Sequence, residues 1–177
     1  MFLSKCFSIQ IKNGEKKMAN FKTADLCDEY SEELKICELE LKSYGGERSF
    51  SGKIATVRVF EDNVLVKEAL QTVEEGSILV VDGAGSRKCA LMGDMLGEIA
   101  QERNLAGVII NSCVRDSAEL GKMSIGVLAI GTNPLKSVKR GHGNRDVTLS
   151  FGGIEWVPGH YAYCDEDGVV VCSRPLV

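Results

Sequence analysis

Hydrophobic residues recur at two distinct spacings in the first half of the chain. Helical spacing after a hydroxyl residue predicts a helix over about residues 23–33 with Thr23 as its cap, and a second helical pattern covers residues 64–73, before Gly76. Residues 54–60 instead alternate between apolar and polar, which is typical of a half-buried strand. The first half of the chain therefore mixes helices and strands.

Two apolar runs in the middle of the chain have no polar interruption. They cover residues 77–82 and 107–111, and a helix from residue 93 or 94 to residue 103 is expected between them. Strands that are apolar on both faces are typical of a parallel sheet covered by helices, so we expect an α/β fold. A further apolar run covers residues 126–131, and a β-rich C-terminal part follows, with short strands at 147–151, 154–157 and 168–172.

Composition narrows the class of protein. With 177 residues, of which 44% are hydrophobic, the chain is long enough for one core and too short for two ordinary domains. A formal net charge of −4 and a pI near 5.3 argue against direct nucleic-acid binding, while a protein partner or an anionic small substrate stays open. No apolar run approaches the ~20 residues of a membrane helix, and no signal peptide is evident. We therefore expect a cytoplasmic protein without a membrane segment.

The cysteine pattern also indicates a cytoplasmic protein. Their number is odd and no pair has the C-x-x-C spacing, which disfavours a disulfide framework or a zinc site. We expect reduced thiols that mostly serve as small core residues. The seven are Cys6, Cys27, Cys37, Cys89, Cys113, Cys164 and Cys172.

The first 17 residues differ in character from the rest. They include the polar run Lys12 to Lys17 and precede a second methionine, Met18. We interpret residues 1–17 as an extension that is either non-native or disordered, with Met18 as the hypothetical true start. Residues 18–177 are expected to form a single domain.

The candidate chemistry lies where two strands are expected to end. Ligands in open α/β sheets bind beyond the carboxyl ends of the strands, here the loops that follow Asp82 and Ile110. The first loop leads into a helix start whose backbone N–H groups can hold a carboxylate. Arg115 in the second loop can donate two hydrogen bonds to the same carboxylate. The N–H groups in question belong to Gly93, Asp94, Met95 and Leu96.

Asp116, next to Arg115, is suited to ligate a hard divalent cation such as Mg²⁺ or Mn²⁺. Beside an α-keto acid, such a cation polarises the carbonyl and stabilises the enolate formed when a C–C bond breaks. Asp94 would then orient or deprotonate a water on the metal. The simpler alternative is a solvated Arg-Asp turn and an aspartate that only begins a helix. Arg145-Asp146, which follows a Gly/His/Asn turn, is expected to be such a surface pair.

The spacing of these residues resembles that of a known family. Asp94, twenty intervening residues, Arg115-Asp116, two residues and Glu119 resemble the signature of the class II 4-hydroxy-4-methyl-2-oxoglutarate aldolases in the RraA-like family. The resemblance to regulator of ribonuclease activity A and its relatives covers about residues 21–174. It also includes Asp25–Asp28, Tyr44–Gly46, Ser49–Gly52, Phe60–Asn63, Val80–Gly83, Phe151–Gly153 and Tyr163–Asp165 with Gly168.

The resemblance implies a compact α/β/α fold of the swivelling type with a central parallel or mixed sheet, in a homotrimer with sites between subunits. It implies a divalent-metal-dependent lyase that acts through a pyruvate enolate, cleaving 4-hydroxy-4-methyl-2-oxoglutarate to two pyruvates, decarboxylating oxaloacetate, or both. By matching positions, Asp94, Arg115 and Asp116 would be catalytic, and Asp116 would hold the metal. Residues 93–96 and Arg115 would bind the α-keto acid, and Glu119 would lie just outside the metal's ligands.

The chain departs from the family pattern at two places. Aldolases of the family often carry a longer C-terminal segment that brings an acidic residue across the interface, whereas this chain stops at Val177. The usual Gly-Asp before the last hairpin is here Gly159-His160, so His160 is expected in a surface turn, and His142 in a flexible loop.

A second function stays open beside the lyase. Overall similarity also runs to short, non-catalytic regulators that bind ribonuclease E and inhibit it. A pure regulator has no chemical need for Asp116 beside Arg115, so the pair favours the enzyme.

Overall fold

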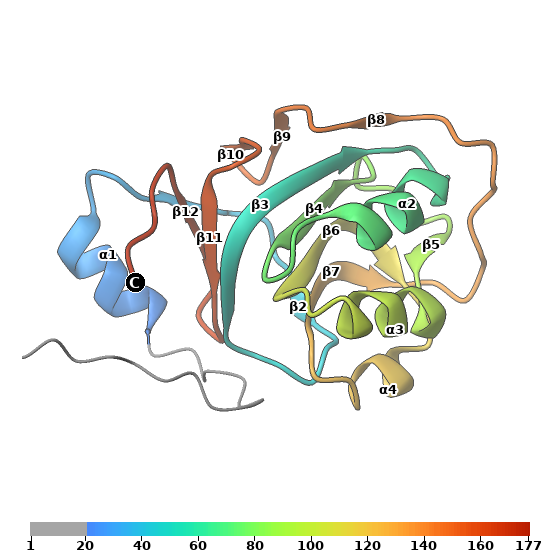
Figure 1. Ribbon diagram of the computed structural model, residues 1–177, viewed down its shortest axis with the longest axis horizontal. Coiled ribbons are helices and arrows are strands. Elements are labelled where there is room, and N and C mark those ends of the chain that lie inside the picture. Colours follow the sequence, from blue (N-terminus) through green and yellow to red (C-terminus); the bar gives the residue numbers. More distant parts are fainter. Residues whose placement is uncertain (1–20) are drawn as a thin grey trace, which may run out of the picture.

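The computed structural model describes residues 21–177, so the interpretation of residues 1–17 and of Met18 lies outside the described residues (Figure 1). The helices are α1 (Thr23–Tyr30), α2 (Val64–Thr72), α3 (Asp94–Glu102) and α4 (Ser117–Leu120). The strands are β1 (Lys35–Ile36), β2 (Lys42–Ser43), β3 (Phe50–Arg58), β4 (Ile78–Asp82), β5 (Ala90–Met92), β6 (Gly107–Val114), β7 (Gly126–Thr132), β8 (Asn144–Arg145), β9 (Leu149–Phe151), β10 (Ile154–Trp156), β11 (Tyr161–Cys164) and β12 (Val169–Cys172). Among the described residues, no helix is long and apolar enough to cross a membrane.

The two unbroken apolar runs are neighbouring parallel strands, as predicted. The central sheet has the order β1-β12-β11-β3-β4-β6-β7-β2, in which β3, β4, β6 and β7 run parallel. In the pairing of β4 with β6, Asp82 lies opposite Asn111, and the Asn111 side chain donates to Asp82 Oδ1 at 3.0 Å. β6 continues three residues beyond the predicted end, so Arg115 follows the strand directly.

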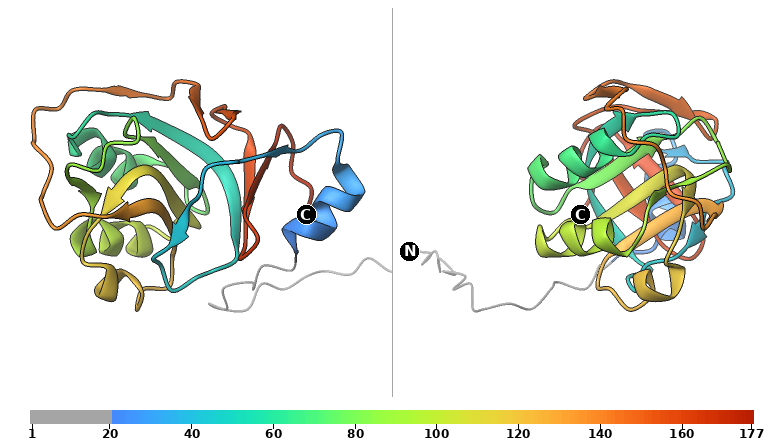
Figure 2. Two further views of the ribbon diagram at one scale, coloured as in Figure 1. Left: turned by 180° about the vertical axis from the view of Figure 1, so that it is seen from behind. Right: turned by 90° about the vertical axis from the view of Figure 1, so that its right-hand side faces the viewer.

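Burial of both strand faces explains why the interiors of the runs, residues 78–81 and 108–110, have no polar residue. Leu79 and Val81 of β4 pack toward α2 and α3, while Ile78 and Val80 face the opposite side. That opposite side is covered by strands: the β9–β10 hairpin with Trp156, and the antiparallel pair β11–β12 (Figure 2). The expected mixed central sheet with flanking helices and a β-rich C-terminal part is confirmed, but the layer over the second face is β structure rather than helix.

β3 joins the parallel part of the sheet to its antiparallel part. It begins at Phe50, four residues before the predicted start, because its first residues pair with β11 and its later ones with β4. The Phe50 ring lies across the first residues of β6 and β7, where a Cβ on Gly107 or Gly126 would come within 2.3 or 2.2 Å of ring atoms. Both strands therefore begin with glycine for steric reasons.

The start of α1 is capped by a distant residue, and the predicted cap at Thr23 is wrong. Thr23 is the first helical residue, and its backbone N and its Oγ1 each donate to the Asp165 carboxylate at 2.7 Å. Burial favours the neutral form of this carboxyl, but the donated bonds outweigh it and lower the pKa of Asp165. Asp165 thereby holds α1 against the outer face of β11 and β12, where Leu26 packs on Tyr163 and Val170.

The described cysteines fit the expected role. All six are free, and four of them are buried: Cys89, Cys113, Cys164 and Cys172. Burial raises the pKa of each of these four thiols, which keeps them protonated and unreactive.

We predict that Asp165→Asn destabilises the protein by about 1 kcal/mol at pH 7, because the charged cap of α1 is lost. A carboxyl whose pKa is lowered by folding stabilises above its unfolded pKa, and the effect is lost as pH falls through the folded value. The difference between variant and wild type should therefore shrink below about pH 4. Urea unfolding at several pH values measures it.

The matched control for this experiment is Asp167→Asn. It removes the same charge from an exposed carboxylate two residues away that accepts no hydrogen bond in the described part of the chain. An equal loss of stability in both variants, or a pH-independent loss in Asp165→Asn, would contradict the capping role.

Candidate active site

The ends of β5 and β6 bring the predicted site residues together. β5 pairs in parallel with the end of β6 and leads into α3 through Gly93, while Arg115 and Asp116 follow β6. The Arg115 backbone N donates to Met92 O at 2.9 Å, which ties the two strand ends to each other. Asp94 and the Arg-Asp pair are therefore neighbours, although twenty residues separate them in the chain.

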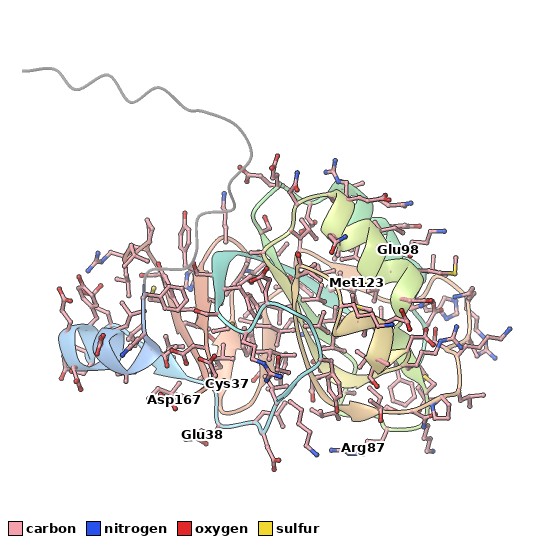
Figure 3. The ribbon with its side chains drawn as sticks, turned by 90° about the horizontal axis from the view of Figure 1, so that it is seen from below. Cys37, Glu38, Arg87, Glu98, Met123 and Asp167 are labelled. Atoms are coloured by element: carbon pink, nitrogen blue, oxygen red, sulfur yellow. The ribbon has the colours of Figure 1, made fainter. Side chains whose placement is uncertain are left out.

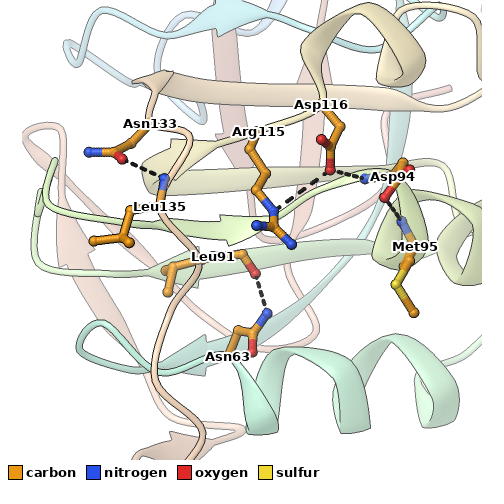
Figure 4. A network of polar contacts seen from close by, with 8 residues as sticks. All are labelled: Asn63, Leu91, Asp94, Met95, Arg115, Asp116, Asn133 and Leu135. Carbon is orange, nitrogen blue, oxygen red and sulfur yellow. Dashed lines mark hydrogen bonds and ion pairs between the residues drawn. The ribbon is translucent and has the colours of Figure 1, made fainter.

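Asp116 adopts a backbone conformation that few side chains tolerate. Its φ of 52° and ψ of 39° lie in the left-handed region, where aspartate is among the less costly residues. This turn directs the carboxylate back onto α3: Oδ2 accepts from Asp94 N at 3.3 Å and lies 3.7 Å from Arg115 Nε (Figure 4). A Cβ at Gly93 would come within 2.4 Å of the same oxygen, so only glycine fits there.

The helix start predicted to hold an anion is occupied by carboxylates of the protein itself. Besides the bond from Asp94 N to Asp116, Met95 N donates to Asp94 Oδ1 at 2.7 Å (Figure 4). Asp94 therefore has the ordinary helix-start role that the sequence also allowed. The attraction between an anion and this helix start is nevertheless present, since a carboxylate lies against it.

A cleft of about 730 Å³ opens beside this helix start, which is within the usual range of about 300–1,000 Å³ for small-ligand sites. It lies between α2 and α3 and includes every predicted site residue except Glu119. Its predicted lining residues are Gly93, Asp94, Met95, Leu96, Arg115 and Asp116. Glu119 instead forms an ion pair with Lys122 at 2.9 Å on the exposed side of α4.

One wall of the cleft was not predicted from the sequence. The segment after β7 contributes Lys136, Ser137 and Lys139, and Asn63 contributes from the residue before α2. The rule that ligands bind beyond the carboxyl ends of parallel strands also covers the segment after residue 132. Applied to the third apolar run, residues 126–131, the same rule indicates Lys136 and Lys139 as candidate site residues.

The buried side chain of Asp62 anchors the segment after β7 that forms this wall of the cleft. It is 2% exposed and accepts bonds from the backbone N of Val64, Arg140 and His142. Burial favours its neutral form, but the backbone donors outweigh burial and lower the pKa of Asp62. The ionised carboxylate thereby holds the chain around Lys139 against the start of α2.

The donor set suits a hard divalent cation. Asp94 and Asp116 offer carboxylate oxygens at the rim of the same cleft, and within the described residues no group of three or more His, Cys, Asp or Glu is arranged to hold a metal ion. Mg²⁺ is commonly bound by one or two carboxylates together with water and substrate oxygens. A cation of this kind fits the residues present, with Asp116 and Asp94 as the groups that would hold it directly or through water.

The residues set aside in the sequence analysis lie outside the cleft. His142 is exposed in the segment between β7 and β8, and His160 follows the turn between β10 and β11, where it is half-buried. The expectation of a surface pair holds for Asp146 and is wrong for Arg145, which lies in β8. Arg145 is half-buried because it donates to Thr72 Oγ1 at 2.8 Å across α2.

Comparison with known proteins identifies relatives over nearly the whole described chain. A family model described as "RraA-like: Aldolase/RraA" matches residues 23–171. A protein of Bacillus cereus (strain ZK / E33L) is 56% identical over 88% of this chain and 98% of its own. A protein of Aromatoleum aromaticum is 49% identical over 89% of this chain and 99% of its own. Both are named "Putative 4-hydroxy-4-methyl-2-oxoglutarate aldolase".

Solved structures share the same fold. A Geobacillus kaustophilus protein described as an S-adenosylmethionine:2-dimethylmenaquinone methyltransferase is 65% identical, with a TM-score of 0.88 over 88% of this chain and 97% of its own. The RNA-processing inhibitor RraA of Thermus thermophilis is 41% identical, with a TM-score of 0.86 over 89% of this chain and 96% of its own.

We predict that Asp116→Gly is more stable than Asp116→Ala by about 1 kcal/mol, because glycine adopts a positive φ freely and alanine does not. Both variants lose the carboxylate. The difference between their free energies of unfolding therefore reports the cost of the left-handed backbone conformation alone. Urea unfolding measures the two free energies. Equal stability of the two variants would show that the turn relaxes out of the left-handed region.

Proposed function

Because this chain belongs to the RraA-like family, we propose that it is a divalent-metal-dependent carbon–carbon lyase acting on α-keto acids. The proposed reactions are cleavage of 4-hydroxy-4-methyl-2-oxoglutarate to two pyruvates and decarboxylation of oxaloacetate, which share a pyruvate enolate. The observation that supports it most is the meeting of Arg115, Asp116 and Asp94 at one helix start inside the cleft. The names of the curated relatives support the same substrate.

Each residue has a definite task in this proposal. Arg115 binds the substrate carboxylate through two coplanar N–H donors, which a lysine lacks. The backbone N–H groups at the start of α3 donate further hydrogen bonds to it. In the cleavage, the C4 hydroxyl loses its proton, the C3–C4 bond breaks, and its electrons pass to the 2-oxo group before C3 is protonated. Asp94 orients a water or takes the proton through it. A cation held at Asp116 supplies Lewis-acid stabilisation of the developing negative charge.

Loading the site changes the partners of Asp116. In the structure its carboxylate accepts from Asp94 N and lies near Arg115, which are the donors that the substrate carboxylate needs. If the Asp116 carboxylate turned toward a cation, both donors would be free for the substrate. We therefore expect the cation to strengthen binding of the α-keto acid as well as to promote its reaction.

The assembly belongs to the same proposal. Within the described chain, the carboxylates that meet at the start of α3 in the cleft are those of Asp94 and Asp116. A homotrimer with sites between neighbours would add groups from a second subunit, and Glu119, which faces Lys122, would then serve the site only indirectly. We place the enzyme in the cytoplasm, consistent with six free cysteines.

A regulatory function is the second candidate. It is favoured by the 41% identity to a protein described as an RNA-processing inhibitor. Binding to ribonuclease E would then be the activity of the chain, and the Arg-Asp pair would not be required for it. Inhibition of purified ribonuclease E that survives Asp116→Asn, without pyruvate release by the wild type, would favour this candidate over the lyase.

We predict that Asp116→Asn lowers turnover at least 100-fold with either substrate. The amide keeps the size and the left-handed preference of the residue but lacks the negative charge that a cation requires. Pyruvate release is measured with Mg²⁺, with Mn²⁺ and with chelator, and chelator should abolish wild-type activity. Undiminished turnover in the variant would remove the metal assignment, and the urea midpoint shows whether it folds.

We predict a homotrimer of the 19.2 kDa chain at micromolar concentration. In a ring closed by rotational symmetry, both contact surfaces of every subunit are occupied, so no further subunit can add. Light scattering after size-exclusion chromatography measures the mass. A mass of one chain with full activity would refute both the ring and the shared site.

A further inference from the structure

The segment between β7 and β8 lines a second cavity besides the cleft. The cleft runs along α3 beside Glu98 (Figure 3), and Lys139 of the segment belongs to its lining. The neighbouring Val138 and Arg140 instead line a cavity of about 440 Å³ that shares no lining residue with the cleft. This second cavity is also within the usual size range of small-ligand sites, about 300–1,000 Å³.

The second cavity lies beyond the carboxyl ends of two parallel strands. Arg58 is the last residue of β3 and Asp82 is the last residue of β4, and the two are paired across the strands. Both residues line the cavity, and Figure 1 shows the segment from β7 to β8 passing this edge of the sheet. Ligands of α/β sheets bind at this edge. The cleft begins at the ends of β5 and β6, so the edge offers two separate places for ligands.

One wall of the second cavity is held in place by internal hydrogen bonds. The Asp62 carboxylate, which is 2% exposed, accepts from Arg140 N at 2.8 Å and from His142 N at 3.3 Å. Val138 N donates to Glu61 O at 2.9 Å. The backbone that carries the lining side chains is therefore ordered before a ligand binds, which lowers the entropic cost of binding.

The second cavity combines an aromatic ring with two arginines. Phe60 and Val138 line it and are 63% and 46% exposed, so an apolar surface faces solvent there. The Arg140 guanidinium has no hydrogen-bond or ion-pair partner within residues 21–177. Arg58 donates from one guanidinium nitrogen to a backbone carbonyl at 2.9 Å. A flat ring can stack on Phe60, and a phosphate can receive paired N–H donors from Arg140.

The charges around the second cavity do not favour a simple anion. At pH 7 the charges of Arg58 and Arg140 are balanced by those of Asp62 and Asp82. The Asp62 carboxylate is buried among backbone donors, whereas Asp82 is half-buried and, within the described chain, accepts hydrogen bonds through Oδ1 alone. Its second oxygen can accept from a ligand. The cavity therefore suits a ligand that carries hydrogen-bond donors as well as an anionic group.

We propose that the second cavity binds a nucleoside monophosphate. The base stacks on Phe60, hydroxyl or amino groups of the nucleoside donate to Asp82, and the phosphate accepts from Arg140, with Arg58 and His142 beside it. Each part of such a ligand meets a side chain of matching chemistry. Stacking is tolerant of the base, so the class is defined by the ring, the donors and the phosphate together.

Calorimetry with AMP, adenosine and ribose 5-phosphate tests the two halves of the ligand separately. The wild type should bind AMP at least about 10-fold more tightly than either half, because stacking and charge-assisted hydrogen bonds act together. GMP, CMP and UMP extend the comparison to the other bases. If none of the four nucleotides binds more tightly than ribose 5-phosphate, the proposal is wrong.

Two variants assign the halves of the ligand to residues. Phe60→Ala should weaken AMP binding about 10-fold and leave ribose 5-phosphate binding unchanged, because only stacking is lost. Arg140→Met should weaken AMP binding about 10- to 100-fold and leave adenosine binding unchanged, because only the phosphate contact is lost. Both side chains are exposed, and the urea midpoint verifies that each variant folds. AMP binding that is unchanged in both variants would refute the site.

Two further variants serve as controls. Arg48→Met removes an exposed arginine that lines neither the cleft nor the second cavity, and Lys136→Met removes a cation of the cleft. Both should bind AMP as the wild type does. A loss in Lys136→Met equal to that in Arg140→Met would place the nucleotide in the cleft, and an equal loss in Arg48→Met would reveal unspecific attraction; either result overturns the proposal. No measurement requires turnover, so the outcome is independent of the proposed lyase activity.

Discussion

The carboxylate of Asp116 lies against the first turn of α3, and this contact joins a strand end, a glycine and a helix start into one site. It requires the left-handed backbone at Asp116, which turns the side chain back, and it requires the absence of a side chain at Gly93. The bond from Arg115 N to Met92 O keeps the two strand ends in register. Because β5 and β6 are paired in parallel, the distance between the turn and the helix is set by the sheet.

Under the proposed function, the same donors would serve two anions at different times. Asp94 N and the Arg115 guanidinium contact Asp116 in the structure, and a substrate carboxylate would need both. The free protein therefore avoids an unpaired helix start and an unpaired guanidinium, each of which would cost free energy. Under the proposed function, an Asp116 carboxylate engaged with a cation would leave both donors to the substrate carboxylate, and metal and substrate binding would be linked.

The asymmetry of the two sheet faces decides where a cleft can form. The face that packs on the β9–β10 hairpin and on β11–β12 is closed by continuous strands and by Trp156. The other face carries the helices α2, α3 and α4, and the cleft lies between α2 and α3 beside the start of α3. Both helices start at the carboxyl end of the strands, so their positive ends and the basic residues of the 133–139 segment face the same space.

Local pattern was sufficient for much of this architecture. The unbroken runs 77–82 and 107–111 predict central parallel strands, and the ends of these strands place Asp94 near Arg115 and Asp116. Tertiary structure alone decided the cap of α1 by Asp165 and the position of Lys136 in the lining of the cleft. These contacts join residues whose spacing along the chain follows no helical or strand period, so only the packing of the folded chain brings them together.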